Sequence, residues 1–184
     1  DTREALALFR EHSREELQSD LDFTAEVFGK AVNGFMNENL RELRKVLTAV
    51  EEKKIHLKQV KRVGTLGVTQ LDHDIAVEKG LYYYQGNDFA SEIIFSIRRL
   101  AEPLKDHIDN NFSPLSPVQK DDFGKVSEQI ISFLRNCATM IRKNDYIGFE
   151  ELIAESITLM NQLTALKKGE LKRIQGQSGS TKVS

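Results

Sequence analysis

The chain lacks several features that would place it in a specialised class of protein. Tryptophan is absent, and Cys137 is the single cysteine among 184 residues, so no disulfide can form within the chain. The three prolines all lie between Pro103 and Pro117, which leaves long stretches on either side free of helix breakers. No apolar run approaches the roughly 20 residues that a membrane-spanning helix needs. These absences exclude a disulfide scaffold and favour a helical protein.

Charge and catalytic motifs are equally sparse. The formal net charge is −2, so the molecule as a whole has no attraction for nucleic acid, and no aromatic residues alternate with its basic ones as stacking platforms. No Ser/His/Asp or Cys/His set is visible, and Gly64 and Gly67 lack the Lys-Ser/Thr that follows a phosphate-binding glycine loop. We therefore expect a protein that is not an enzyme, does not bind nucleic acid and requires no cofactor.

Apolar residues recur at helical spacing along most of the chain. The pattern predicts an all-α fold, an elongated up-and-down helical bundle. A short helix, interrupted or capped near Ser13, comes first. The predicted organisation is a single domain over 1–184: a hairpin over 20–62, a long third helix over 68–111, a linker over 112–118, a second hairpin over 120–175 and a mobile tail over 176–184.

The second hairpin repeats the first with a constant offset. The first hairpin has apolar residues at 27, 28, 31, 32 and 35, and small or apolar residues return 106 positions later at 133, 134, 137, 138 and 141. Lys143-Asn144-Asp145 stands where Asn37-Glu38-Asn39 stood. Matches across two helices and one turn favour an internal repeat over chance similarity of helices. Cys137 then corresponds to Ala31, which predicts a small buried residue.

Three stretches carry a resemblance to a known family. Ala31–Leu40 is similar to the helix-turn segment of PhoU proteins, and Leu100–His107 resembles their acidic third-helix signature. More closely, Leu71–Lys79, Arg98–Leu115 and Arg173-Ile174-Gln175 resemble the PhoU-like C-terminal region of PiT-type inorganic phosphate permeases. PhoU proteins consist of two similar three-helix bundles, which agrees with the repeat.

This resemblance implies a regulatory or assembly domain that modulates phosphate uptake. It would lie on the cytoplasmic face of the inner membrane, as a soluble part of a polypeptide whose membrane-embedded permease is its partner. The start at Asp1 and the polar end then indicate a piece of a longer protein. The alternatives are a free-standing PhoU-type adaptor of phosphate signalling and a metal-binding helical bundle. The second hairpin lacks an acid-bearing third helix, so we expect later residues or a second copy, in a homodimer, to complete it.

The third helix carries the main candidate metal site. Glu102 and Asp106 are spaced i, i+4 and share a helix face, with His107 and Asp109 nearby, so a divalent cation is the cofactor that this pattern would accept. Asp88 with Glu92 and Asp72-His73-Asp74 offer the same kinds of ligand less favourably. The competing interpretation is a solvated acidic face balanced by Arg99 and Lys105.

The second helix of the first hairpin carries a basic stripe. Its members are Lys54, Lys58, Lys61 and Arg62. Such a stripe could face an anionic membrane leaflet or bind a phosphate-containing ligand. The competing interpretation is a solvated helix face balanced by Glu51 and Glu52. In Tyr82-Tyr83-Tyr84, three successive helical residues cover most of the circumference, so at least one ring is expected to be exposed.

Overall fold

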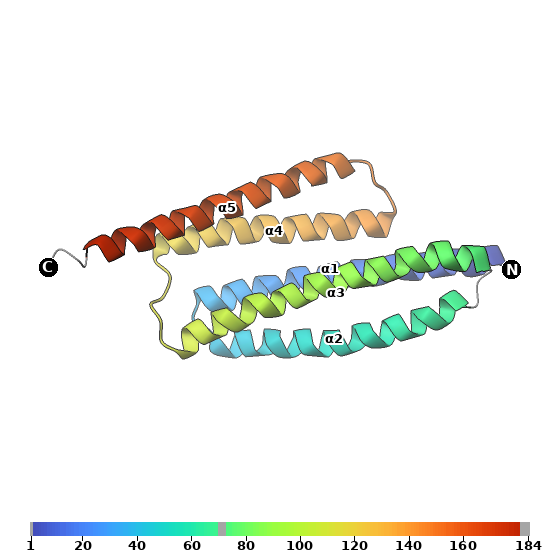
Figure 1. Ribbon diagram of the computed structural model, residues 1–184, viewed down its shortest axis with the longest axis horizontal. Helices are drawn as coiled ribbons and strands as arrows, with labels where there is room; N and C mark the ends of the chain where they lie inside the picture. Colours follow the sequence, from blue (N-terminus) through green and yellow to red (C-terminus); the bar gives the residue numbers. More distant parts are fainter. Residues whose placement is uncertain (1, 70–72, 181–184) are drawn as a thin grey trace.

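Long helices joined by short turns make up the described part of the molecule. The computed structural model describes residues 2–69 and 73–180, which form α1 (Thr2–Met36), α2 (Leu40–Thr69), α3 (His73–Asp109), α4 (Pro117–Lys143) and α5 (Phe149–Ser180). Helices α1, α2 and α3 pack against one another, α4 packs against α1, and α5 packs against α4 (Figure 1). The all-helical prediction is confirmed for these residues.

The first helix is longer than the sequence pattern indicated. Residues 2–36 form one continuous helix, so the short separate helix expected before Asp20 is wrong. Ser13 does not break it, because the Ser13 hydroxyl donates a hydrogen bond of 2.8 Å to the Phe9 carbonyl one turn earlier. The extra turns extend α1 alongside the first part of α3.

The boundary between the second and third helices also differs from the prediction. We expected the third helix to span 68–111, but Val68 and Thr69 belong to α2, and α3 runs from His73 to Asp109. Gly64 and Gly67 lie within α2 and do not end it. A glycine costs a helix only about 1 kcal/mol relative to alanine, which the packing of α2 against α3 offsets.

Gly64 has a specific packing role. A Cβ atom at this position would overlap the ring and hydroxyl of Tyr83, which crosses from α3. The Tyr83 hydroxyl lies 3.2 Å from the Val60 carbonyl oxygen, to which it donates a hydrogen bond. The absence of a side chain at position 64 therefore lets α2 and α3 approach closely.

Gly64→Ala is therefore expected to destabilise the protein by about 1–3 kcal/mol, because Tyr83 must shift out of a close-packed site. Gly124→Ala is the matched control, since a Cβ on this helical glycine of α4 would meet open space. The control substitution should stabilise the fold by about 0.5–1 kcal/mol. Urea unfolding of the two variants measures both effects, and a neutral Gly64→Ala would contradict the packing role.

The connections between helices follow sequence signals closely. Ser116 caps α4 reciprocally with Gln119, and Pro117 occupies the first turn, in agreement with the predicted linker over 112–118. Left-handed residues end three helices: Glu38, Asn111 and Asn144, with φ of 52°, 52° and 50°.

At the C-terminal end, α5 continues to Ser180, so residues 176–180 of the predicted mobile tail are helical. Residues 181–184 of that tail lie outside the described residues.

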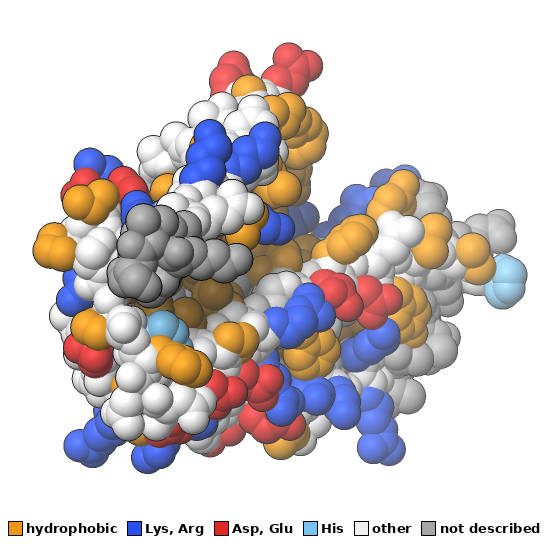
Figure 2. All heavy atoms as spheres, turned by 60° about the vertical axis from the view of Figure 1, so that its left-hand side comes forward, with side chains coloured by type: hydrophobic (Ala, Val, Ile, Leu, Met, Phe, Trp, Pro, Cys, Tyr) orange, Lys and Arg blue, Asp and Glu red, His pale blue; other side chains and the backbone are white. Residues whose placement is uncertain are grey.

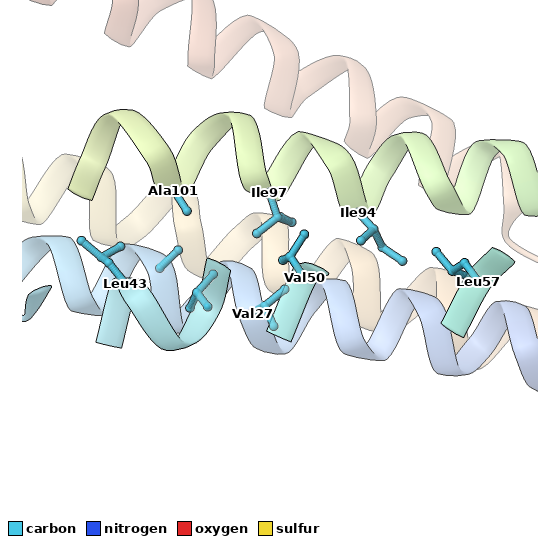
Figure 3. Packing of buried hydrophobic residues seen from close by; sticks show 9 residues of the cluster. Val27, Leu43, Val50, Leu57, Ile94, Ile97 and Ala101 are labelled. Carbon is cyan, nitrogen blue, oxygen red and sulfur yellow. The ribbon is translucent and has the colours of Figure 1, made fainter. Parts of the chain in front are cut away.

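The hydrophobic core lies between α1, α2 and α3 (Figure 3). Its buried members come from one face of each helix and recur every three or four residues, as the apolar pattern predicts. They are Val27, Ala31, Leu43, Val46, Val50, Leu57, Ile94, Ile97 and Ala101. The three-helix bundle therefore holds the main hydrophobic core. Helix α4 packs on this bundle through α1, and α5 packs on α4.

Candidate functional site

The structure pairs each predicted acidic ligand with a basic neighbour. Glu102 Oε1 lies 2.8 Å from Arg98 Nε. Lys105 Nζ lies 3.1 Å from Asp106 Oδ1 and 2.8 Å from Asp109 Oδ2. Lys105 and Arg44 lower the pKa of Asp109. The acidic face of α3 is thus organised as a chain of surface ion pairs.

His107, the fourth predicted ligand, closes one end of the bundle. Its Nε2 lies 2.9 Å from the Ser113 carbonyl oxygen in the linker. Its ring lies 5.3 Å from the Phe35 ring and 5.4 Å from the Phe112 ring. These contacts tie the end of α3 to the last turn of α1 and to the start of the linker.

The other ligand candidates also have defined places. Asp88 pairs with Lys61, and Glu92 pairs with Arg99. Asp72 lies outside the described residues. Among residues 2–69 and 73–180, no three His, Cys, Asp or Glu side chains come together in a group that could hold a metal ion.

The basic stripe is split by its contacts with α3. Lys54 Nζ lies over the Phe95 ring at 5.1 Å, and Lys61 Nζ lies 2.8 Å from Asp88 Oδ1. Lys58 and Arg62 are exposed. Two of the four cations therefore help to hold α2 against α3, while the other two face solvent.

The three tyrosines have different surroundings, as their positions on one helix predicted. Tyr82 is exposed, Tyr83 is buried and Tyr84 is half-buried. Cys137 is half-buried, and burial raises the pKa of its thiol, which disfavours the reactive thiolate.

A polar cluster that the sequence analysis missed lies inside the three-helix bundle. Lys53 Nζ of α2 lies 2.8 Å from Asp20 Oδ1 of α1, and the two side chains are only 13% and 6% exposed. Burial raises the pKa of Asp20, although Lys53 acts in the opposite direction. The pair is thus held in an environment in which water stabilises its charges poorly.

Glu16 lies one turn before Asp20 and extends the cluster. His12 Nε2 lies 2.8 Å from Glu16 Oε1, and the Tyr83 hydroxyl lies 3.5 Å from Glu16 Oε2. Burial raises the pKa of the Glu16 carboxyl above its ordinary value. Burial and the Glu16 charge raise the pKa of Tyr83 to about 12. Glu16 and Tyr83 also form one wall of a cleft.

This cleft has a volume of about 210 Å³ and lies between α1, α3 and the α4–α5 turn. Its walls combine aromatic rings with polar and basic groups. The lining residues are Phe9, Arg10, Ser13, Arg14, Glu16, Leu17, Tyr82, Tyr83, Asn87, Asn144 and Tyr146. Figure 2 shows the molecule hollowed between two lobes, with hydrophobic side chains gathered in the hollow.

Arg10 and Arg14 are the groups in the cleft with the clearest binding chemistry. They are spaced i, i+4 on α1, so both guanidinium groups lie on one helix face. Neither forms an ion pair with a carboxylate of the described residues. Guanidinium groups bind phosphate and carboxylate oxygens with charge-assisted hydrogen bonds, and Ser13, Asn87 and Asn144 add polar groups to the cleft. The arrangement is suited to binding an anion.

The sequence contained one signal for this cleft, the i, i+4 arginine pair. The arginine pair alone did not predict a cleft, because the opposite wall comes from Asn144 and Tyr146, which are distant in sequence.

Comparison of the chain with family models, with curated proteins and with solved structures found no match in any of the three. Within the described ranges, no helix combines the length and the apolar character needed to cross a membrane.

Proposed function

We propose that this chain is a cytosolic regulatory domain of an inorganic phosphate permease, and that the Arg10–Arg14 cleft binds inorganic phosphate or a phosphate-containing ligand. The observation that carries the proposal is a pair of arginines that have no carboxylate partner among the described residues and that line a cleft of about 210 Å³. The resemblance of Arg98–Leu115 to the permease-linked PhoU-like region supports the phosphate context. The domain would lie at the cytoplasmic face of the membrane beside its permease.

The repeat supports the PhoU-like interpretation. At the end of α1, the Asn39 amide donates to the Gly34 carbonyl at 2.7 Å. At the end of α4, the Asp145 amide donates to the Met140 carbonyl at 3.3 Å, 106 positions further along at both ends of the bond. The left-handed residues Glu38 and Asn144 correspond in the same way.

The position of the cleft suggests how binding would act. Arg10 and Arg14 belong to the three-helix bundle, whereas Asn144 and Tyr146 belong to the α4–α5 turn. An anion held by both arginines and by Asn144 would hold the turn against the bundle. Because a ligand that binds one arrangement better shifts the population toward it, phosphate would bias the position of the second hairpin. The permease would respond to that change.

The double variant Arg10→Ala/Arg14→Ala is expected to bind inorganic phosphate at least about tenfold more weakly, because each charge-assisted hydrogen bond contributes roughly 1.5–3 kcal/mol. Isothermal titration calorimetry with phosphate measures the affinity. Arg41→Ala is the matched control, since Arg41 is exposed on α2 and does not line the cleft. Equal phosphate affinity in all three proteins, or no binding by the parent chain, would overturn the assignment of the cleft.

The permease context has its own test. We expect the complete reading frame to encode apolar segments of roughly 20 residues each. We also expect deletion of this domain to change phosphate uptake by cells or its response to phosphate supply. A reading frame without such segments, together with unchanged uptake and control, would contradict the proposal.

A further inference from the structure

The α4–α5 hairpin has an apolar groove on one side. The groove has a volume of about 280 Å³ and is lined almost entirely by apolar side chains of both helices. Phe133, Cys137 and Ile141 come from α4, and Phe149, Leu152 and Ile153 come from α5. Within the described residues, α5 packs only against α4, so no third helix of the chain covers the groove.

The first hairpin shows what kind of element belongs in such a groove. The groove positions 133, 137, 149 and 152 correspond, at the 106-residue offset, to four buried residues of the α1–α2 hairpin: Val27, Ala31, Leu43 and Val46. There, α3 covers the hairpin with Ile94, Ile97 and Ala101 (Figure 3). The groove of the second hairpin therefore fits an amphipathic helix that presents apolar residues every three or four positions.

Helix α5 itself carries such a stripe on its exposed surface. Phe149, Ile153, Met160 and Leu163 follow one another at helical spacing and are 53%, 44%, 64% and 40% exposed. The first two also form a wall of the groove. An apolar patch that runs along four turns of a helix is typical of an interaction surface. Helix α5 provides both the exposed apolar stripe and one wall of the groove. The stripe of one copy can therefore pack into the groove of a second copy.

The charges on α5 select the direction of pairing. Its first turns carry Glu150, Glu151 and Glu155, whereas its later turns carry four basic residues and one acid: Lys167, Lys168, Lys172, Arg173 and Glu170. Two α5 helices side by side in the same direction would bring like charges together. In the antiparallel direction, the acidic part of each helix lies beside the basic part of the other, which is the favourable arrangement.

We propose that the occupant of the groove is α5 of a second copy of this chain, in a symmetric antiparallel dimer. The α4–α5 hairpins of the two copies would form a four-helix bundle in which each α5 packs into the groove of the other. Such an interface is isologous: the same patch is used on both copies, and the two-fold axis crosses α5 near Thr158, so that Glu150 of each copy lies level with Lys167 of the other. This dimer rests on the groove and the charges alone and does not depend on phosphate binding.

The first test is the mass of the chain in solution. Sedimentation velocity of the parent chain at roughly 100 µM should show a dimer, because a Kd in the micromolar range leaves most chains paired at that concentration. Ile153→Asp should weaken the dimer at least about tenfold, because it places a charge in the apolar interface. Ile55→Asp is the matched control, because Ile55 of α2 is also an exposed isoleucine and lies away from the groove. It should leave the dimer intact. A monomeric parent chain, or equal loss in both variants, would overturn the proposal.

The second test addresses the antiparallel direction. Glu150 flanks Phe149 at one end of the stripe, and Lys167 follows Leu163 by one turn at the other. Glu150→Lys and Lys167→Glu should each weaken the dimer about fivefold or more, because each creates two like-charged contacts per symmetric dimer. The double variant restores opposite charges and should return to within about twofold of the parent. A double variant weaker than either single variant would exclude the antiparallel pairing.

Discussion

Asp20→Ala is expected to destabilise the protein by about 3–5 kcal/mol, because it leaves Lys53 as a buried charge without its partner. The Asp20 and Lys53 side chains are 6% and 13% exposed, and their charged atoms lie 2.8 Å apart. The ammonium group also lies 5.4 Å from the centre of the Phe23 ring, a contact too weak to replace the carboxylate. Chemical unfolding in guanidinium or urea measures the loss.

The double variant Asp20→Leu/Lys53→Met is expected to be much closer to the parent in stability than Asp20→Ala. Two apolar side chains of similar volume avoid the cost of taking two charges out of water. Lys105→Ala is the control for a partly exposed surface ion pair, and its loss should be within about 1 kcal/mol. If the double variant lost as much as Asp20→Ala, the pair would be specifically required for folding.

The Asp20–Lys53 pair also makes the stability of the fold depend on pH. Because burial raises the folded-state pKa of Asp20, the folded state holds this proton more tightly than the unfolded chain does. The contribution of this titration to stability is therefore greatest below the unfolded pKa and is lost as pH rises through the raised folded pKa. Asp20→Asn should remove that dependence, which unfolding measurements across this pH range would detect.

Leu43→Ala is expected to cost about 2–5 kcal/mol, whereas Phe149→Ala should cost about 1 kcal/mol or less in the monomer. These residues occupy corresponding positions of the two hairpins, 106 apart in sequence. Leu43 is 0% exposed beneath α3, whereas Phe149 is 53% exposed in the uncovered groove. Truncation of Leu43 leaves a cavity, while truncation of Phe149 removes surface that is already in contact with water.

Unfolding measurements at low micromolar or lower protein concentration give the monomer values. A large loss for Phe149→Ala under these conditions would show that the second hairpin has a core of its own. Ile141→Val provides a milder check on the α4 side of the groove, with an expected loss below about 1.5 kcal/mol.

Local signals in the sequence were sufficient for most of the helical framework. The Ser116-Pro117 start of α4 and the polar turn at Asn37-Glu38-Asn39 act over a few residues, and both appear where the sequence places them. The apolar positions of the first hairpin, such as Val27 and Ala31, are buried as their period predicts. Errors occurred where a local signal is weak: a single Ser13 or Gly64 does not end a helix whose packing on its neighbours is favourable.

The sequence did not predict the roles of residues that depend on contact with another helix. Lys53 belonged to a run of charged residues, and only the approach of α1 to α2 makes it the partner of a buried Asp20. Arg10 and Arg14 become walls of a cleft only because the α4–α5 turn lies against α1.

The sequence by itself determined that the described residues are helical and where the first turn and the linker before α4 lie, because helix periodicity and capping are properties of neighbouring residues. The tertiary structure decided which of the two similar hairpins is covered. That difference depends on α3, which packs on the first hairpin and leaves the second with an open apolar groove. Burial is set by the three-dimensional neighbours of a helix face, and those neighbours are distant in sequence.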